Sequence, residues 1–192
     1  MSVTSPRRSA RERLLAAADE LFYAEGVHTI GIDRVIERAG VAKASLYSSF
    51  GSKDGLVRAY LQHRHEERRA RLMGHVEKHE GPRDRLLAIF DSLAESAAKP
   101  GFRGCAFYNA GAESDPNGVV REASEANRAW TRGLLTDLAR EAGIAEPAPL
   151  VAQLVLLYDG ATVGARQDKG PAAAHTARAL AAVLVDAALA SR

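Results

Sequence analysis

The chain has one cysteine, Cys105, and few aromatic residues, which make up 6% of its 192 positions. A single cysteine excludes an intrachain disulfide, and a reducing compartment is its natural setting, so we expect a cytoplasmic protein. No basic-then-apolar leader with a cleavage site is visible, so we expect no secretion signal. The longest apolar stretch, 150–157, contains Gln153 and is too short to cross a bilayer. We therefore expect no membrane partner.

Runs of β-branched residues, which strands favour, are also missing, and alanine and leucine dominate instead. Glycine and proline cluster between segments of helical periodicity. With 46% hydrophobic and 26% charged residues, the composition is that of a soluble globular protein that can build a core. The sequence predicts an all-α fold of about nine helices.

Motifs that carry catalysis or hold a cofactor are missing too. We find no nucleophile elbow, no phosphate-binding glycine loop and no paired-cysteine motif, so we expect neither an enzyme nor a cofactor. His75 and His79 share a helix face at a spacing that metals accept, and His63 and His65 lie nearby, but no further ligands are arranged around them. We expect a solvated face and no metal. Cys105 is not expected to sense redox changes, since buried cysteines are usually inert.

Positive charge is concentrated at the front of the chain. The net charge is +2 overall, but it is +4 over residues 1–85 and −2 over residues 86–192. A basic front on a slightly acidic body predicts a polyanionic partner for the front alone. We expect residues 1–8 to form a flexible basic arm whose Arg7 and Arg8 either keep the chain soluble or reach DNA.

Apolar spacing predicts the order of the helices. Ser9 is expected to cap the first helix, which Gly26 ends, and Ser52 to cap the fourth, which extends to residue 79. The other expected helices span residues 32–39, 43–50, 84–98, a short segment within 102–118, 119–142, 148–167 and 172–191.

The helices expected over 32–39 and 43–50 have eight residues each and meet at Ala39-Gly40-Val41. Helices this short are marginal alone and need tertiary packing. Gly40 permits a tight turn between them, as in a helix-turn-helix, which presents its second helix to the major groove of DNA. Taken alone, such a turn is more often a plain helical corner. Small or hydroxyl-bearing residues follow it on the outward side, and these permit close approach to bases and phosphates. They are Ala42, Ala44, Ser45, Ser48 and Ser49.

The stretch from Ala10 to Val57 resembles the DNA-binding domain of the TetR family of bacterial repressors. The matching strings are "LLAAADELFYAEG" and "IDRVIERAGVAKASLYSSFGSKDGLV", and Tyr47-x-x-Phe50-x-Ser52-Lys53 is their most specific part. The resemblance implies a three-helix DNA-binding domain over residues 9–53, with its helix-turn-helix at about 31–50. It implies a ligand-binding and dimerisation bundle over residues 54–192.

The resemblance also implies a function: a homodimeric repressor that binds a pseudo-palindromic operator in double-stranded DNA until a small apolar or aromatic inducer releases it. The alternative is a helical small-molecule or metal-binding protein that does not regulate through DNA. DNA contacts are expected from Arg7, Arg8, Thr29, Lys43, Ala44, Ser45, Tyr47, Ser48 and Lys53. The chain departs from the family pattern at Ile30 and Gly31, where a threonine or serine is usual.

In the body, the resemblance implies an inducer pocket among the middle helices. The aromatic and polar residues available for it are Phe90, Phe102, Cys105, Phe107, Asn109, Glu113, Trp130 and Tyr158. Aromatic residues at helical spacing also fit a plain core. The last two helices carry apolar stripes, expected to form a four-helix dimer interface or to close the core of the single chain. These stripes contain Leu150, Leu154, Leu157, Ala161, Leu180, Leu184 and Ala188.

Overall fold

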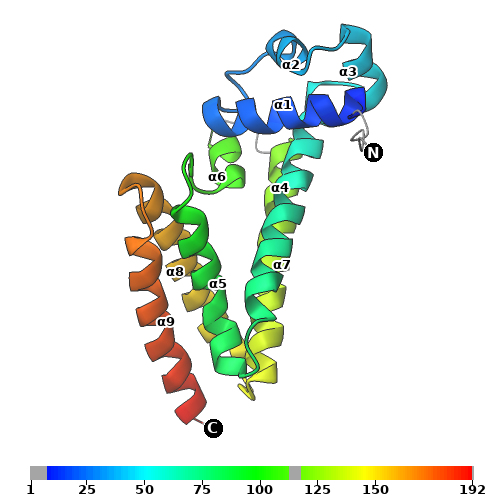
Figure 1. The fold of residues 1–192 in the computed structure, drawn as a ribbon. Helices are drawn as coiled ribbons and strands as arrows, with labels where there is room; N and C mark the ends of the chain where they lie inside the picture. The colour runs from blue at the N-terminus through cyan, green and yellow to red at the C-terminus, as the bar shows by residue number, and fades with distance from the viewer. Residues whose placement is uncertain (1–7, 113–117, 192) are drawn as a thin grey trace, which may run out of the picture. The chain divides into compact units, whose positions relative to one another are not determined.

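The computed structural model of the chain describes residues 8–112 and 118–191. The described residues form nine α-helices and no strand, which confirms the predicted fold class (Figure 1). The helices are α1 (Ala10–Glu25), α2 (Ile32–Ala39), α3 (Lys43–Phe50), α4 (Lys53–Val76), α5 (Pro82–Ala97), α6 (Ala106–Gly111), α7 (Val119–Glu141), α8 (Pro147–Gln167) and α9 (Ala172–Ala190).

The helices are grouped into two compact units. The first unit comprises residues up to Arg64 together with Ala106–Ser124, and the second comprises His65–Cys105 and Glu125–Arg192. Helices α4 and α7 therefore each contribute to both units. The boundary predicted from the sequence lay after residue 53, the first residue of α4, whereas the first unit extends along α4 to Arg64 and includes all of α6 and the start of α7.

Helix α1 begins with a capping box, as the sequence predicted for Ser9. The Ser9 hydroxyl accepts a 3.2 Å hydrogen bond from the Glu12 backbone, and the Ser9 backbone donates a 2.7 Å bond to the Glu12 carboxylate. These bonds satisfy two donors that a helix start otherwise leaves unpaired. The bond from the Ser9 backbone is also the main reason that the pKa of Glu12 lies below its usual value.

The core of the first unit is formed where α1 packs on α2 and α3. Leu14, Val35 and Leu46 are fully buried, and burial of each such side chain stabilises the fold by roughly 1.5–3 kcal/mol. Phe22 of α1 meets Tyr60 of α4 edge to face, with ring centroids 5.5 Å apart. Packing against α1 therefore stabilises two helices that are too short to form alone.

Gly55 permits the close approach between the end of α3 and the start of α4. Ser52 caps α4 as predicted, because its hydroxyl accepts a 3.1 Å hydrogen bond from the Gly55 backbone. A Cβ at Gly55 would lie 1.9 Å from the carbonyl oxygen of Phe50, a separation that no side chain can occupy. The need for glycine at this position was not predicted from the sequence.

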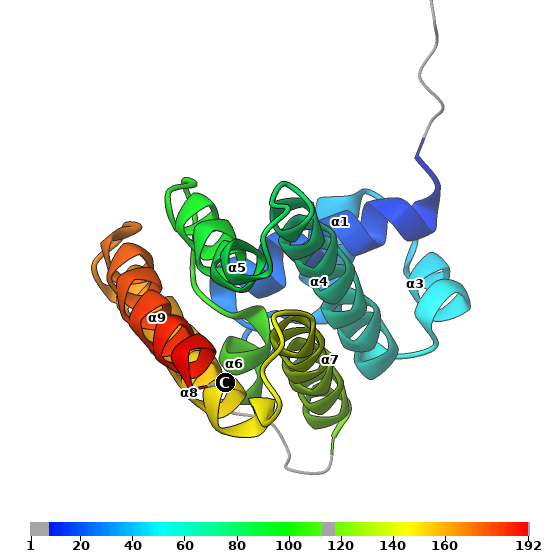
Figure 2. The ribbon, with the colours of Figure 1, turned by 90° about the horizontal axis from the view of Figure 1, so that it is seen from below.

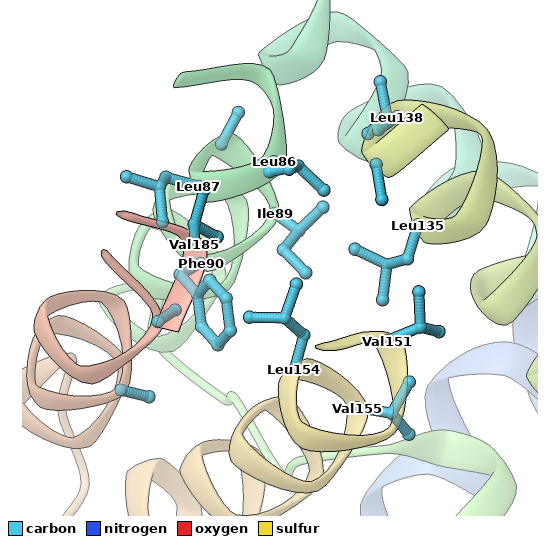
Figure 3. Packing of buried hydrophobic residues seen from close by; sticks show 14 of the residues in the cluster. Leu86, Leu87, Ile89, Phe90, Leu135, Leu138, Val151, Leu154, Val155 and Val185 are labelled. Atoms are coloured by element: carbon cyan, nitrogen blue, oxygen red, sulfur yellow. The ribbon is translucent and has the colours of Figure 1, made fainter. Parts of the chain in front are cut away.

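The core of the second unit lies where α5 packs on α8 and α9 and α8 packs on α9 (Figure 2). Leu86, Leu87, Ile89 and Phe90 of α5 point into it together with apolar side chains of α7, α8 and α9 (Figure 3). At Gly164 of α8, an added Cβ would lie 2.8 Å from the Cβ of Ala173, so α8 and α9 are in close contact.

This core contains three of the residues predicted to form a dimer interface. Leu150, Leu154 and Ala161 are 4%, 0% and 5% exposed. They pack within their own unit and cannot form an interface with a second copy. For these three the alternative is correct: the stripe on α8 closes the core of the chain, because the buried face of an amphipathic helix carries the same apolar spacing as a dimer seam.

Helices α8 and α9 are each long and apolar enough to cross a membrane, judged by length and composition alone. The apolar run at 150–157 is only a short part of α8. The finding is weak, because core helices of soluble proteins pass the same test and both helices pack with α5 in the core of the second unit. The absence of a membrane partner therefore stays a prediction.

Candidate nucleic-acid interface

The turn between α2 and α3 is built on a left-handed glycine. Gly40 has φ 61° and ψ 45°, and its N–H donates a 3.0 Å hydrogen bond to the Glu37 carbonyl. Glycine adopts this conformation without the steric cost that other residues incur. Val41 is half-buried after it, and the bond from the Ser45 N–H to the Ala42 carbonyl, 2.9 Å, begins α3. The predicted helix-turn-helix is present.

Two arginines near the start of α1 fix this turn and the end of α3. Arg13 donates from Nη2 to the Gly40 carbonyl at 2.7 Å, and a Cβ at Gly40 would lie 2.8 Å from the same Nη2 atom. The guanidinium of Arg11 lies 5.2 Å from the centroid of the Phe50 ring. Both side chains thus hold the helix-turn-helix against α1, a role that the sequence analysis did not foresee.

Two further arginines tie α2 to α1. Arg34 pairs with Glu25 at 2.6 Å and Arg38 with Glu20 at 2.7 Å. All four side chains are 39–56% exposed, so solvent screens both pairs and they add little to the stability of the fold. The two ion pairs mainly orient α2, because they fix how α2 and the turn after it pack on α1.

The outward face of α3 carries the side chains that the sequence predicted for DNA contact. Leu46 is fully buried and anchors the helix, while Tyr47 is 48% exposed. Ala44 and Ser48 are exposed, and Ser45 is half-buried. The Ser48 hydroxyl donates to the Ser45 carbonyl at 3.2 Å, and its oxygen can still accept a hydrogen bond. The face combines small residues, hydroxyl groups and one phenol.

Lys43, the one basic residue of α3, is paired with Asp33 of α2. The Lys43 Nζ lies 3.0 Å from an Asp33 carboxylate oxygen, and the two side chains are 57% and 80% exposed. The hydrogen bond that Lys43 donates to the Asp33 carboxylate raises the pKa of Lys43. Because the pair is open to solvent, the lysine can exchange the carboxylate for a phosphate, but Asp33 competes for it.

The remaining predicted DNA contacts have different surroundings. Thr29 is exposed just before α2, while the following Ile30 is 1% exposed and cannot reach a phosphate. Lys53 is half-buried as the first residue of α4, and Arg8 is exposed. Arg7 lies outside the described residues.

A hollow of about 370 Å³ on the first unit brings Arg8 beside Arg13 and Arg38. Glu20 also lines it and pairs with Arg38. This concentration of positive charge joins residues from α1, from the segment before it and from the end of α2. Only the tertiary structure reveals it.

The residues predicted to line an inducer pocket are divided between the two units. In the second unit, Phe90 is fully buried with its ring centroid 6.0 Å from that of Tyr158. Phe102 and Trp130 pack on the same core, and Cys105 is half-buried. Two predicted residues belong to α6 in the first unit, Phe107 and Asn109, and Glu113 lies outside the described residues. A single pocket formed by all eight stays a prediction.

A polar cluster in the second unit was missed by the sequence analysis. Arg68 of α4 donates from Nη1 to Thr131 Oγ1 at 2.9 Å and to Asn127 Oδ1 at 3.3 Å, both on α7. His65 Nδ1 lies 3.2 Å from the same Asn127 oxygen. Asn127 is only 6% exposed, which is unusual for an amide side chain. Asn127 and Thr131 are four residues apart and therefore share one face of α7. This spacing of two polar residues is the feature of the sequence that could have indicated the cluster.

No group of three or more histidine, cysteine, aspartate or glutamate side chains capable of holding a metal is found among residues 8–112 and 118–191. His75 instead hydrogen bonds to Glu95, with 2.8 Å between Nε2 and the carboxylate. Glu95 also pairs with Lys99, and these two partners lower the pKa of the Glu95 carboxyl to about 2.

Apolar side chains are exposed on α8 and α9. Leu156 is 74% exposed and Val163 43% on α8; Leu180 is 51% and Val183 66% on α9. Of the predicted interface residues, only Leu180 belongs to this exposed set. Three others are half-buried and are Leu157, Leu184 and Ala188.

Known proteins similar to this chain are DNA-binding regulators. The sequence model of the bacterial regulatory proteins of the tetR family matches residues 14–60. The crystal structure of a TetR-family transcriptional regulator from Streptomyces coelicolor is 34% identical, covers 95% of each chain and superposes with a TM-score of 0.82.

Two curated relatives match less than a third of the chain. The transcriptional activator FasR of Mycolicibacterium smegmatis is 47% identical over 57 residues, which are 30% of this chain and 26% of FasR. The transcriptional repressor BdcR of Escherichia coli is 41% identical over 56 residues, 29% of this chain and 28% of BdcR. Each match thus spans about a quarter of the length of the relative.

Proposed function

Because this chain belongs to the TetR family of DNA-binding transcriptional regulators, which are not enzymes, we propose that it is a repressor that a small-molecule inducer releases from its operator. The observation that carries the proposal is the outward face of α3. Tyr47, Ala44 and Ser48 are exposed on a helix that Leu46 anchors and that the Arg13–Gly40 bond positions. A rigidly held helix with small and hydroxyl-bearing residues can enter the major groove.

The direction of regulation is part of the proposal, since one relative is an activator and the other a repressor. Repression requires only that the bound protein occupies the promoter. Activation requires in addition a surface that recruits the transcription machinery. We propose repression because it needs nothing beyond the DNA-binding face.

We propose that the chain acts as a homodimer through α8 and α9. The support is the exposure of Leu156 and Val163 on α8 and of Leu180 and Val183 on α9. Two helices from each copy can bury these residues in a four-helix interface with two-fold symmetry. Such a dimer reads two half-sites one helical turn apart, about 34–36 Å, or a multiple of that distance.

The inducer acts by differential affinity. It binds better to a conformer whose two recognition helices are wrongly spaced for the operator, and it therefore lowers DNA occupancy. By linkage, the operator weakens inducer binding by the same factor.

One observation favours the alternative of a helical ligand-binding protein that does not act through DNA. Asp33 neutralises Lys43, the one basic residue of α3. Among the predicted DNA contacts in the described part of the chain, Arg8 and Lys53 are the remaining basic residues.

The experiment that decides between the two is sequencing the DNA that the full-length protein retains from a random pool of duplexes. We expect an inverted repeat with half-sites one turn or a multiple apart, and weaker retention as the salt concentration rises. A reporter behind the retained sequence then gives the direction of regulation, since a repressor lowers its expression. Retention of no common sequence by a folded protein would overturn the proposed function.

A further inference from the structure

Arg68 lies half-buried in the second unit, and its partners there are all neutral. Its Nη1 donates to Thr131 and Asn127, and its guanidinium lies 5.2 Å from the centroid of the Tyr158 ring. In the described part of the chain no carboxylate lies within ion-pair distance of Arg68. Transfer of a guanidinium from water into a protein is unfavourable, and amide, hydroxyl and aromatic partners offset only part of that.

Other arginines of the same unit have a different environment. Five of them pair with carboxylates: Arg83 with Asp186, Arg85 with Glu141, Arg128 with Asp159, Arg140 with Asp137 and Arg178 with Asp91. Arg83, Arg85 and Arg178 are half-buried like Arg68, so the unit provides carboxylates for half-buried arginines, yet none in the described part of the chain lies within ion-pair distance of Arg68. No described residue therefore supplies a counterion for this cation.

Arg71 adds to the unbalanced positive charge. It lies three residues after Arg68, a spacing that puts both on one side of α4. Its Nε is buried without a hydrogen-bond partner, and its Nη1 reaches only the Glu67 carbonyl at 3.4 Å. Two adjacent half-buried arginines without carboxylate partners create a positive potential that favours an anion.

The Arg68 guanidinium is held in one orientation. Asn127 Oδ1 accepts from Arg68 and also lies 3.2 Å from His65 Nδ1, and the Asn127 side chain is itself buried. Both hydrogen bonds of Arg68 use Nη1, and Nε and Nη2 donate to no described residue. A guanidinium that is fixed on one side and open on the other matches the two oxygens of a carboxylate.

Aromatic surface surrounds the cluster. The Trp130 ring meets the His65 ring edge to face, with centroids 5.5 Å apart, and Tyr158 lies beneath Arg68. Trp130, His65 and Tyr158 are all half-buried and so remain accessible to a small molecule. Flat side chains beside a fixed guanidinium suit a ligand that has both a ring and a negative charge.

We propose that Arg68 binds the carboxylate of a small aromatic acid, and that the effector of this regulator is therefore an organic anion. The proposal is more specific than an apolar inducer, because it names the chemical class of the ligand. It rests on the proposed function only in assuming that this ligand controls DNA binding. Asn127 and Thr131 are positioning residues for the guanidinium, and Trp130 and Tyr158 contact the ring.

The test compares simple acids with their neutral amides. Benzoate, phenylacetate and cinnamate are each titrated against the full-length protein beside benzamide, phenylacetamide and cinnamamide, and the melting temperature and Trp130 fluorescence are recorded. We expect at least one acid to raise the melting temperature and change the fluorescence at concentrations where its amide does neither. The two molecules of each pair share size and ring, so the difference reports the charge.

Arg68→Gln should weaken binding of that acid at least tenfold, because the charge-assisted bonds are lost. The matched control is Arg140→Gln, which removes the same charge from an exposed position of α7. The Arg140 side chain is 67% exposed and pairs with Asp137 at the surface, so this variant should bind the acid within about twofold of the wild type.

The proposal is overturned if no acid binds, if the amides bind as the acids do, or if Arg68→Gln binds the acid unchanged. The comparison of acid with amide uses the unaltered protein and stands even if Arg68→Gln fails to fold. A failure of the proposed function gives a different result: the acid binds through Arg68 but does not release DNA, or no DNA sequence is selected at all.

Discussion

Arg13 and Gly40 join the first helix to the turn of the DNA-binding motif. The Nη2 atom of Arg13 donates a 2.7 Å hydrogen bond to the carbonyl oxygen of Gly40, which has the left-handed backbone of the turn. Helices α2 and α3 have only eight residues each, so contacts with α1 rather than helix propensity hold them in place. This one bond therefore connects the stability of the motif to the direction in which α3 faces.

The first prediction is that Arg13→Ala lowers the free energy of unfolding by about 1 kcal/mol, because the bond is charge-assisted but half-exposed. DNA affinity should fall as well, since the turn loses a fixed partner. The measurements are urea denaturation and DNA titration. Arg8→Ala is the control: Arg8 is exposed, so the same measurements should find a change in stability below about 0.5 kcal/mol. Equal destabilisation by the two variants would contradict the assigned role of Arg13.

A second prediction concerns two glycines of α4. Gly55→Ala should destabilise the first unit by about 3 kcal/mol or more, because its Cβ would lie 1.9 Å from the Phe50 carbonyl oxygen. Gly74→Ala should instead stabilise the protein by up to about 1 kcal/mol, since no atom lies within 4 Å of that Cβ and alanine favours the helix. Thermal and urea unfolding of both variants measures the difference. A Gly55→Ala protein as stable as the wild type would show that the backbone does not pass from α3 to α4 as described.

The third prediction tests the DNA-binding face. Tyr47→Ala and Lys53→Ala should weaken DNA binding while the melting temperature stays within a few degrees of the wild type. We expect both residues to contact the phosphate backbone, so affinity should fall alike on all sequences. Lys53→Ala should also reduce the slope of log affinity against log salt concentration by about one phosphate contact. If both variants bind the selected operator as the wild type does, the interface lies elsewhere.

The fourth prediction uses the pair of Lys43 and Asp33. Asp33→Asn should tighten DNA binding several-fold, because it removes a negative charge from the DNA-binding face and frees Lys43 for a phosphate. The salt dependence should become steeper at the same time. Glu37→Gln is a control that removes an acidic charge from another exposed position of α2. Weaker binding by Asp33→Asn would mean that the carboxylate itself positions Lys43 for DNA.

A fifth prediction addresses the dimer. Introducing Leu156→Glu and Val183→Glu together should yield a folded monomer of 20.5 kDa at micromolar concentration, because both residues are exposed in the single chain and buried in the proposed interface. Sedimentation measures the mass and circular dichroism the fold. Leu154→Glu should unfold the chain, since Leu154 is fully buried in its own unit. A wild-type protein that sediments as a monomer would contradict the proposed homodimer.

The order and type of the helices could be predicted from the sequence because those signals are local. The period of the apolar residues, the capping box at Ser9 and the glycine at position 40 act within a few residues of themselves. The family resemblance over residues 10–57 rested on the same kind of signal, a continuous string, and structural similarity over nearly the whole chain supports it.

The tertiary structure alone determined which side chains far apart in the sequence contact one another. The spacing of apolar residues on α8 is the same for a core as for a dimer seam, so only burial could show that Leu154 belongs to the core. Likewise, Arg13 and Arg68 are ordinary surface residues in the sequence, and their partners lie 27 and about 60 positions away. Helical periodicity determines which residues share a face, but the element that covers that face is set by the packing of the whole chain.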